Sequence, residues 1–177
     1  MAASGIIPQV VSNFNVYDGG TDRMLGVADE VKLPDLQPKT TTLDAAGTAG
    51  EMDIPVPGQL QDMESEINFN ITDSQFYQSI HEGGSVNFTL RGSVQTIDSS
   101  TASITNVPVV IVLKGLMKQI TSGSIKKSDA MSASLKIEVL YYSFAYNGSD
   151  LDVEVDKLNN VYKIGNSDLS ADISSQI

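Results

Sequence analysis

The chain has 177 residues, of which 41% are hydrophobic and 19% are charged, and it contains no cysteine. This composition fits one globular domain, residues 1–177, with neither a disulfide framework nor a thiolate metal site. The formal net charge of −11 argues against nucleic-acid binding, because such affinity comes mostly from Lys and Arg that neutralise phosphates. The N-terminus lacks a basic segment followed by a long apolar one, and no 18 apolar residues run together. We therefore expect neither a secretory signal nor a membrane span.

The first third of the chain contains two strand-like runs and then a long irregular segment. Residues 10–20 are rich in β-formers and end in Asp-Gly-Gly, a turn signal, and residues 24–34 form a second run that Pro34 ends. Residues 35–60 hold three of the six prolines and three glycines, with little periodicity. They predict a long loop, and such loops in compact domains are usually functional or mobile.

Residues 62–71 alternate between apolar and polar side chains, which is typical of a strand with one buried face. The apolar face carries Met63, Ile67, Phe69 and Ile71. The polar face carries Glu64, Glu66, Asn68 and Asn70.

One short helix is predicted at about residues 72–82. Thr72 and Gln75 have the spacing of a capping box, and Phe76, Tyr77 and Ile80 form an apolar stripe at helical spacing. A Gly-Gly pair at 83–84 ends the helix.

The rest of the chain predicts further strands, at 85–97, 104–120, 134–148 and 150–164. Strands, one short helix and more strands indicate a mainly β fold, in sandwich or barrel form. In the third of these strands one face carries Leu135, Ile137, Val139 and Tyr141. The other face, with Lys136, Glu138, Leu140 and Tyr142, is only half polar, so we expect a neighbouring subunit to cover it.

Few residues are candidates for chemistry. His81, the single histidine, lies at the predicted helix end, where a surface role is the ordinary interpretation. Asp150, Asp152, Glu154 and Asp156 align on one strand face. An EF-hand would need Gly and Glu at positions that are here Val155 and Val161. A solvated acidic strand face is therefore the favoured interpretation.

A basic segment lies within residues 114–127 and contains Lys114, Lys118, Lys126 and Lys127. On an acidic protein it could bind an anion or the acidic surface of another copy of the chain. Segregated charge and a half-apolar strand face together indicate self-association through heterologous contacts, which close into rings when the rotation permits.

Several blocks in a fixed order also resemble a known family. They are NFNVYDGG, LGVADEVKLPDL, AAGTAGEMDIPV, DMESEINFNI, Leu90-Arg91-Gly92, VVIVLKGLMKQITSGSIKKSD, LKIEVLYYSFAYNG and VDKLNNVYKIGNSDL. Over residues 9–170 the chain resembles the major tail tube proteins of contractile-tailed bacteriophages and of phage-tail-like bacteriocins. The last residues, SADISSQI, fall outside the resemblance.

The resemblance implies a structural subunit with no active site and no cofactor. Its implied fold is two packed antiparallel β-sheets with one flanking helix, as in the tube proteins of type VI secretion systems. Six copies would form a ring with a shared inner β-barrel, and rings would stack into a hollow tube inside a contractile sheath. Implied partners are other copies, the sheath protein, baseplate or initiator proteins, a tape-measure protein, and DNA that passes without specific binding. The particle, a virion tail or a bacteriocin, would be assembled in the host bacterial cytoplasm.

The resemblance also gives each segment an expected role. The 35–60 loop would reach the adjacent ring, and residues 1–8 and 170–177 would be terminal arms. The candidates for subunit interfaces are Lys114, Lys118, Lys126, Lys127, Leu140, Tyr142, Ala46, Gly47 and Gly50. The candidates for lining the lumen are Glu64, Glu66, Asn68 and Asn70. An acidic lining would repel DNA phosphates within a Debye length of about 8 Å. A solvated outer face under the sheath is the alternative for these four.

Two other classes of protein remain open at this point. A β-sandwich that binds a ligand as a monomer fits an all-β chain, but its sites usually use exposed aromatics, and this chain has no Trp. A hydrolase would need a nucleophile motif, which is not evident beside the single His81. The sequence does not distinguish an infectious phage from a bacteriocin.

Overall fold

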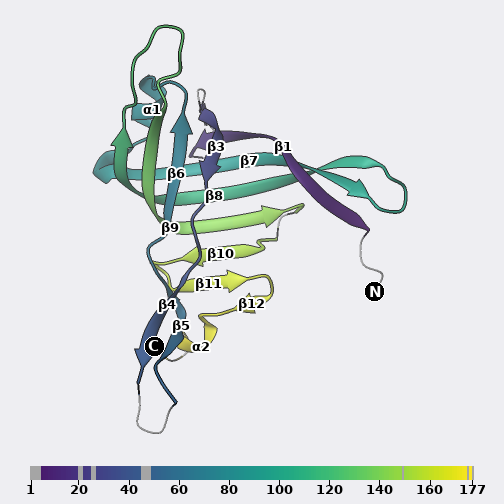
Figure 1. Ribbon diagram of the computed structural model, residues 1–177, viewed down its shortest axis with the longest axis vertical. Helices are drawn as coiled ribbons and strands as arrows, with labels where there is room; N and C mark the ends of the chain where they lie inside the picture. The colour runs from purple at the N-terminus through teal and green to yellow at the C-terminus, as the bar shows by residue number, and fades with distance from the viewer. Residues whose placement is uncertain are drawn as a thin grey trace.

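The computed structural model describes residues 5–19, 22–24, 27–44, 49–148, 150–174 and 176. It is mainly β, as predicted (Figure 1). The strands are β1 (Ile6–Asp18), β2 (Asp22–Met24), β3 (Val27–Lys32), β4 (Pro38–Leu43), β5 (Met52–Leu60), β6 (Glu64–Phe69), β7 (Ser85–Asp98), β8 (Ile104–Thr121), β9 (Ala133–Tyr146), β10 (Val153–Asp156), β11 (Val161–Ile164) and β12 (Ser167–Asp168). The helices are α1 (Ser74–Gln78), the 3-10 turn η1 (Glu82–Gly84) and α2 (Ala171–Ser174).

All pairs among the described strands are antiparallel, and they form a large sheet and a separate two-stranded sheet. The large sheet has the order β12-β11-β10-β9-β8-β7-β1-β2. It branches at β9, whose first half pairs with β6 and whose second half pairs with β10, and β3 continues the sheet beyond β6. Strands β3 and β6 thereby cross over β7 and β8 as a second layer (Figure 1). Among the described strands no barrel closes within the chain, and the predicted class of packed antiparallel sheets is confirmed.

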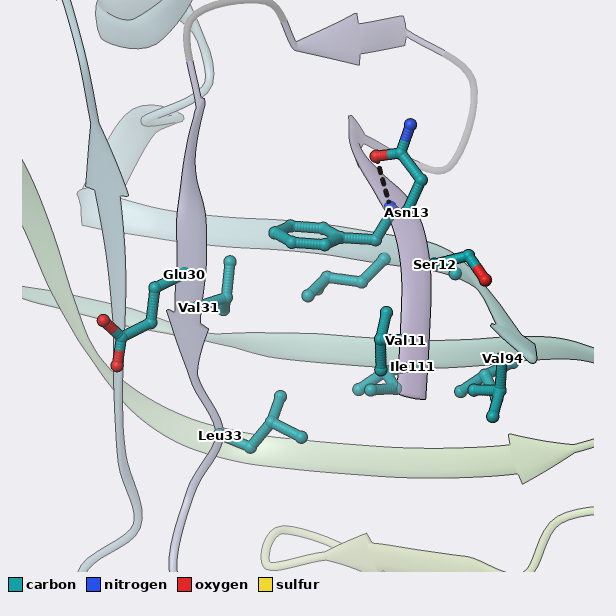
Figure 2. Close-up of a pocket in the computed structure, with 12 residues that line it drawn as sticks. Val11, Ser12, Asn13, Glu30, Val31, Leu33, Val94 and Ile111 are labelled. Carbon is teal, nitrogen blue, oxygen red and sulfur yellow. Dashed lines mark hydrogen bonds between the residues drawn. The ribbon is translucent and has the colours of Figure 1, made fainter. Parts of the chain in front are cut away.

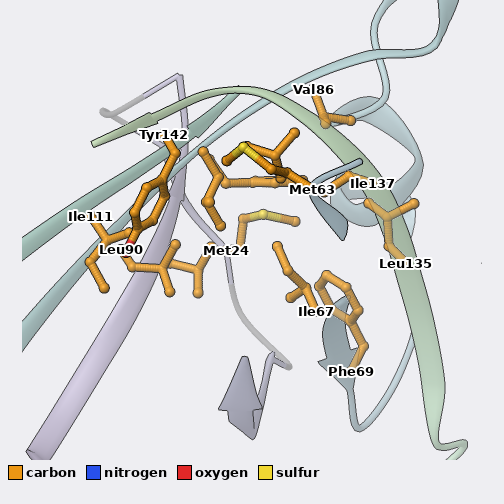
Figure 3. Close-up of a cluster of buried hydrophobic side chains, with 14 of the residues drawn as sticks. Met24, Met63, Ile67, Phe69, Val86, Leu90, Ile111, Leu135, Ile137 and Tyr142 are labelled. Atoms are coloured by element: carbon orange, nitrogen blue, oxygen red, sulfur yellow. The ribbon is translucent and has the colours of Figure 1, made fainter. Parts of the chain in front are cut away.

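The hydrophobic core lies between these layers (Figure 3). On β6 the predicted alternation is confirmed, because Ile67 and Phe69 are buried while Glu64 and Glu66 are only half-buried. Ser65 is also buried, and its hydroxyl donates a hydrogen bond to the Lys32 carbonyl across 2.7 Å. The side chains that meet these residues come from β7, β8 and β9, and include Phe88, Leu90, Ile111, Leu113, Leu135 and Ile137. Ile71 was predicted to be buried but is 56% exposed, since β6 ends before it.

The prediction of a long loop at 35–60 was wrong. Most of that segment is a β-hairpin, in which β4 pairs with β5 from Leu43 and Met52 to Pro38 and Leu60. Prolines lack the backbone donor that an interior strand needs, but a two-stranded sheet has free edges that tolerate them. Proline content therefore concealed a strand that belongs to an isolated hairpin.

The predicted helix is shorter than expected and has a different cap. Asp73, and not Thr72, is the N-cap, because its side chain accepts a hydrogen bond from the Phe76 amide at 3.0 Å. The helix α1 ends at Gln78, and the Gly-Gly pair forms the separate turn η1, in which Gly83 has a φ of 77°. Phe76 anchors α1 through an edge-to-face contact with Phe69, with ring centroids 4.7 Å apart.

A bulge in β9 changes the predicted faces of that strand. Leu135, Ile137 and Val139 are fully buried, as predicted. A register shift opposite Lys114 and Gly115 then adds Leu140 as an extra residue, so that Tyr142, and not Tyr141, enters the core. The second face of β9 is therefore less apolar than the sequence indicated. The predicted strand at 150–164 is likewise two strands, β10 and β11, joined by a turn.

Candidate assembly surfaces

Several exposed apolar side chains lie together on a three-stranded arm that extends beyond the second layer (Figure 1). We define the arm as residues 6–13 of β1, 93–98 of β7 and 104–108 of β8. Five of its large hydrophobic side chains are between 47% and 62% exposed, and they are Ile6, Ile7, Val10, Val11 and Ile104. Val94 and Ile97 are half-buried, and Val107 is buried. Sequence reasoning missed the exposed side chains, although the apolar run IIPQVV at residues 6–11 does not alternate and could have indicated a strand that a partner covers on both faces.

Both edges of the arm are open. On one side β2 pairs only with Val16–Asp18 of β1, so that no described strand pairs with residues 6–15 there. On the other side the pairing of β9 with β8 ends at Val109, and one further hydrogen bond joins the Asn147 amide to the Pro108 carbonyl at the base of the arm. No described strand pairs with residues 104–107 there. Unpaired N–H and C=O groups on a strand edge can form hydrogen bonds with a strand of another chain. Pro8 and two register shifts in β1 make this edge irregular, which limits indiscriminate pairing.

A groove of about 470 Å³ lies beneath the arm, between β1 and the segment 30–33 (Figure 2). Most of its lining is apolar, with Phe14, Val31 and Leu33 facing the strands β7 and β8. Of its polar members, Asn13 uses its side-chain oxygen to accept a hydrogen bond from the Phe14 amide at 2.8 Å. The groove therefore continues the hydrophobic core outward to the arm.

The β4–β5 hairpin and the β8–β9 loop, residues 122–132, project at opposite ends of the long axis (Figure 1). The hairpin exposes Leu43, Met52 and Ile54 by 41–44%. The loop exposes Ile125 by 88% beside the exposed Lys126 and Lys127. Gly50, in the hairpin turn, has a φ of 152° and open space around it, whereas Ala46 and Gly47 lie outside the described residues.

The predicted lumen carboxylates belong to a network of ion pairs. Lys118 Nζ lies 2.9 Å from Glu64 and 3.9 Å from Asp62, and Lys136 Nζ lies 3.7 Å from Glu64 and 3.9 Å from Glu66. The hydrogen bond from Lys118 holds the pKa of Glu64 below its ordinary value, and Glu64 in turn raises the pKa of Lys118. These carboxylates are thus largely balanced by cations of the same chain.

Other predicted residues are dispersed. Lys114 lies over the Tyr141 ring, 5.0 Å from its centroid. Lys118 forms an ion pair with Glu64. The four predicted lysines therefore do not form one patch. Leu140 is half-buried and Tyr142 is 7% exposed within the chain's own core. Burial raises the pKa of the Tyr142 hydroxyl. Asn68 is half-buried, and the carbonyl of the exposed Asn70 accepts from the Met131 amide at 2.7 Å.

Three of the four acidic residues at 150–156 have local structural roles, and the fourth, Asp150, is exposed. Asp152 accepts from the Tyr146 amide at 2.7 Å, Glu154 lies 3.5 Å from Lys163, and Asp156 accepts from the amides of the β10–β11 turn. In the described part of the chain no three acidic, His or Cys side chains form a group able to hold a metal ion. His81 lies 3.6 Å from Asp18 on the surface. No described helix has the length and apolar character needed to cross a membrane.

The arm has open edges, the hairpin exposes apolar side chains, and the hairpin and the β8–β9 loop project charged residues at opposite ends. These features define a class of protein, the self-assembling β-structural subunit. Comparison with known proteins narrows the class. The sequence profile of the phage tail tube protein FII family matches residues 8–177. The tail tube protein of Escherichia phage P2 is 26% identical over 166 residues, which cover 92% of each chain.

A solved structure also shares the fold. It is a chain from the cryo-EM structure of an extracellular contractile injection system, the PVC sheath/tube terminator in the extended state. The TM-score is 0.51 at 13% identity, covering 78% of this chain and 97% of the other. The chain belongs to the phage tail tube protein FII family and is a structural subunit of a tail tube, as the sequence predicted.

Proposed function

We propose that six copies of this chain join side by side into a ring and that rings stack into the hollow inner tube of a contractile tail. The observation that supports this most directly is the arm, whose two open edges and exposed apolar side chains need a cover that no described residue provides. In a ring, the arm of one copy pairs with the next copy around the axis. Closure pairs the edges of the arm, which is the general solution for edge strands.

The groove beneath the arm supports the same proposal. Because it is apolar and continuous with the core, a neighbour that covers the arm also closes the groove. Its volume falls within the range of small-molecule sites, which would suit a monomeric binding module. Such sites need a few convergent polar groups. One of the groove's polar side chains, Asn13, already accepts a hydrogen bond from the Phe14 amide, which weakens the case for a ligand site.

The tube would conduct DNA or ions across the target envelope, inside a sheath and on a baseplate or initiator, with a tape-measure protein during assembly in the host cytoplasm. The polar face of β6, with Glu64, Glu66, Asn68 and Asn70, is the proposed lumen lining. Lys118 and Lys136 lower the net charge of this face, so that passing phosphates meet ion pairs more than free carboxylates. The hairpin would contact the next ring, and the described ends of the terminal arms, residues 6–8 in β1 and helix α2, lie where neighbours can reach them.

The test is negative-stain electron microscopy of the concentrated protein, with its mass in solution measured in parallel. We expect sixfold rings or hollow rods with a uniform channel, at least when a baseplate seed is added. A strict monomer at every concentration, seeded or not, would overturn the proposal and favour the binding module.

A further inference from the structure

The two projecting segments of the chain lie at opposite ends of its longest axis and carry opposite charge. The hairpin is at the end near the C-terminus, and the β8–β9 loop is at the end near α1 (Figure 1). They are too far apart to meet within one copy. Successive copies aligned along this axis would bring the hairpin of one against the loop of the next.

The hairpin end is acidic and partly apolar. Residues 43–53 contain three carboxylates and no basic residue. The described carboxylates are Asp44, Glu51 and Asp53, and all three residues are exposed. Leu43, Met52 and Ile54 are exposed beside them. The hairpin packs on the segment 169–173 at Gly58, but its half near the turn has no such support among the described residues. Two unsupported strands are marginally stable in water, so this half gains from a partner that packs on its apolar side chains.

The loop end is basic at its tip and fixed at its base. The Ser124 amide donates to the Met131 carbonyl at 2.8 Å, and the Met131 amide donates to the Asn70 carbonyl at 2.7 Å. Gly123, with a φ of 72°, passes so close to Met131 that a Cβ there would overlap its carbonyl. These hydrogen bonds fix the base of the loop, so that Ile125, Lys126 and Lys127 lie exposed at its tip in a preformed conformation.

We propose that the hairpin of one subunit docks on the β8–β9 loop of the subunit in the next ring. Lys126 and Lys127 face Asp44 and Glu51, and Ile125 packs on the exposed apolar side chains of the hairpin. This inference rests on the proposed tube, and it names the contact that stacks one ring on another. The occupant is a second copy because the two complementary surfaces belong to the same chain, and a heterologous contact of this kind repeats without closing.

Two reversed variants test the contact. The loop variant carries Lys126→Glu and Lys127→Glu, and the hairpin variant carries Asp44→Lys and Glu51→Lys. In each variant alone, loop and hairpin have the same sign, so we expect rings or short stacks but no rods. An equimolar mixture restores opposite signs at every junction, with rings of the two variants alternating, and we expect it to recover rods. Asp129→Lys, a single charge reversal in the same loop that leaves its basic sign unchanged, is the control and keeps rod formation.

Cross-linking gives a measurement that does not depend on rod length. The chain has no cysteine, so Glu51→Cys with Lys126→Cys introduces one defined pair. A bifunctional maleimide should join chains of assembled protein into a covalent ladder, while Glu51→Cys alone should give at most dimers. If either reversed variant alone forms rods of normal length and no ladder appears, the proposed contact between hairpin and loop is wrong, while the proposed tube still stands. A wild-type chain that forms neither rings nor rods with a seed would overturn the tube as well.

Discussion

Lys118 on β8 and Glu64 on β6 form an ion pair with 2.9 Å between Nζ and Oε2, although β9 lies between the two strands. Lys136 of β9 lies 3.7 Å from the other oxygen of the same carboxylate. The pair thus ties three strands together at the branch point of the sheet.

The acid stability of the protein should depend on this ion pair. The Lys118 hydrogen bond lowers the pKa of Glu64, so its contribution is present above the ordinary Glu pKa and is lost as the pH falls through the lowered value. Lys118→Met should therefore lower the urea midpoint at pH 7 slightly and reduce its dependence on pH below about 4.5. Urea titrations from pH 7 to pH 3 measure this, with Lys127→Met on the exposed loop as control. An unchanged pH dependence in Lys118→Met would contradict the assignment.

Phe76 should carry the docking of α1. Its side chain is 1% exposed and contacts Phe69 edge to face. Phe76→Ala should lower the free energy of unfolding by about 3–5 kcal/mol, as for other buried aromatics. Tyr77→Ala, at the neighbouring position that is 52% exposed, should cost far less. Equal losses in chemical denaturation would show that α1 is not held by Phe76.

Gly115 should be intolerant of any side chain. A Cβ at this position would overlap the Glu138 carbonyl in the adjacent strand, so Gly115→Ala should destabilise by about 1–3 kcal/mol or more through forced backbone movement. Gly92→Ala is the matched control on β7, because its Cβ would meet only ordinary contacts at 3.6 Å. Thermal unfolding of the two variants distinguishes them, and similar melting temperatures would refute the close approach.

The arm should control ring formation without controlling the fold. Ile7→Lys with Val10→Lys places charges on side chains that are 51% and 57% exposed. We expect a folded monomer with a wild-type circular dichroism spectrum that no longer forms rings. Leu158→Lys is the control, since that side chain is 77% exposed on a turn and not on an open edge. Normal rings from the arm variant would place the lateral interface elsewhere.

Tyr142 should limit stability at high pH. Burial raises the pKa of its hydroxyl above the ordinary value of 10.0, so the folded chain holds this proton more tightly than the unfolded chain. Stability should fall as the pH rises above about 10, and Tyr142→Phe should remove part of that fall. Denaturation midpoints at pH 8 and pH 11 test this, and Tyr77→Phe, at an exposed ring, should leave the fall unchanged.

The sequence predicted those parts of the fold that depend on simple periodicity. The alternation in β6 and the first half of β9 matched the buried faces because side chains in a regular strand must alternate. Beyond Val139 the prediction failed, since one bulge residue exchanged the faces of Tyr141 and Tyr142. Nothing in the local pattern of residues 139–142 shows where the partner strand shifts its register.

The assembly surfaces were harder to predict than the fold. The sequence predicted that the carboxylates on the polar face of β6 are unpaired, but Lys118 and Lys136, from two other strands, form ion pairs with Glu64. The hairpin was read as a loop because its prolines are compatible with free edges as well as with irregular backbone. Only the pairing of strands distant in sequence shows which edges are left open at the arm.

The ladder between β7 and β8 runs from Ser85 and Leu116 to Ile97 and Ile104 without a register shift. The same two strands therefore build the core and the arm, with no hinge between them. A force applied along the arm acts on many parallel hydrogen bonds that must break together, and not on a single loop. Mechanical stiffness is thus a property of each subunit before any neighbour is added.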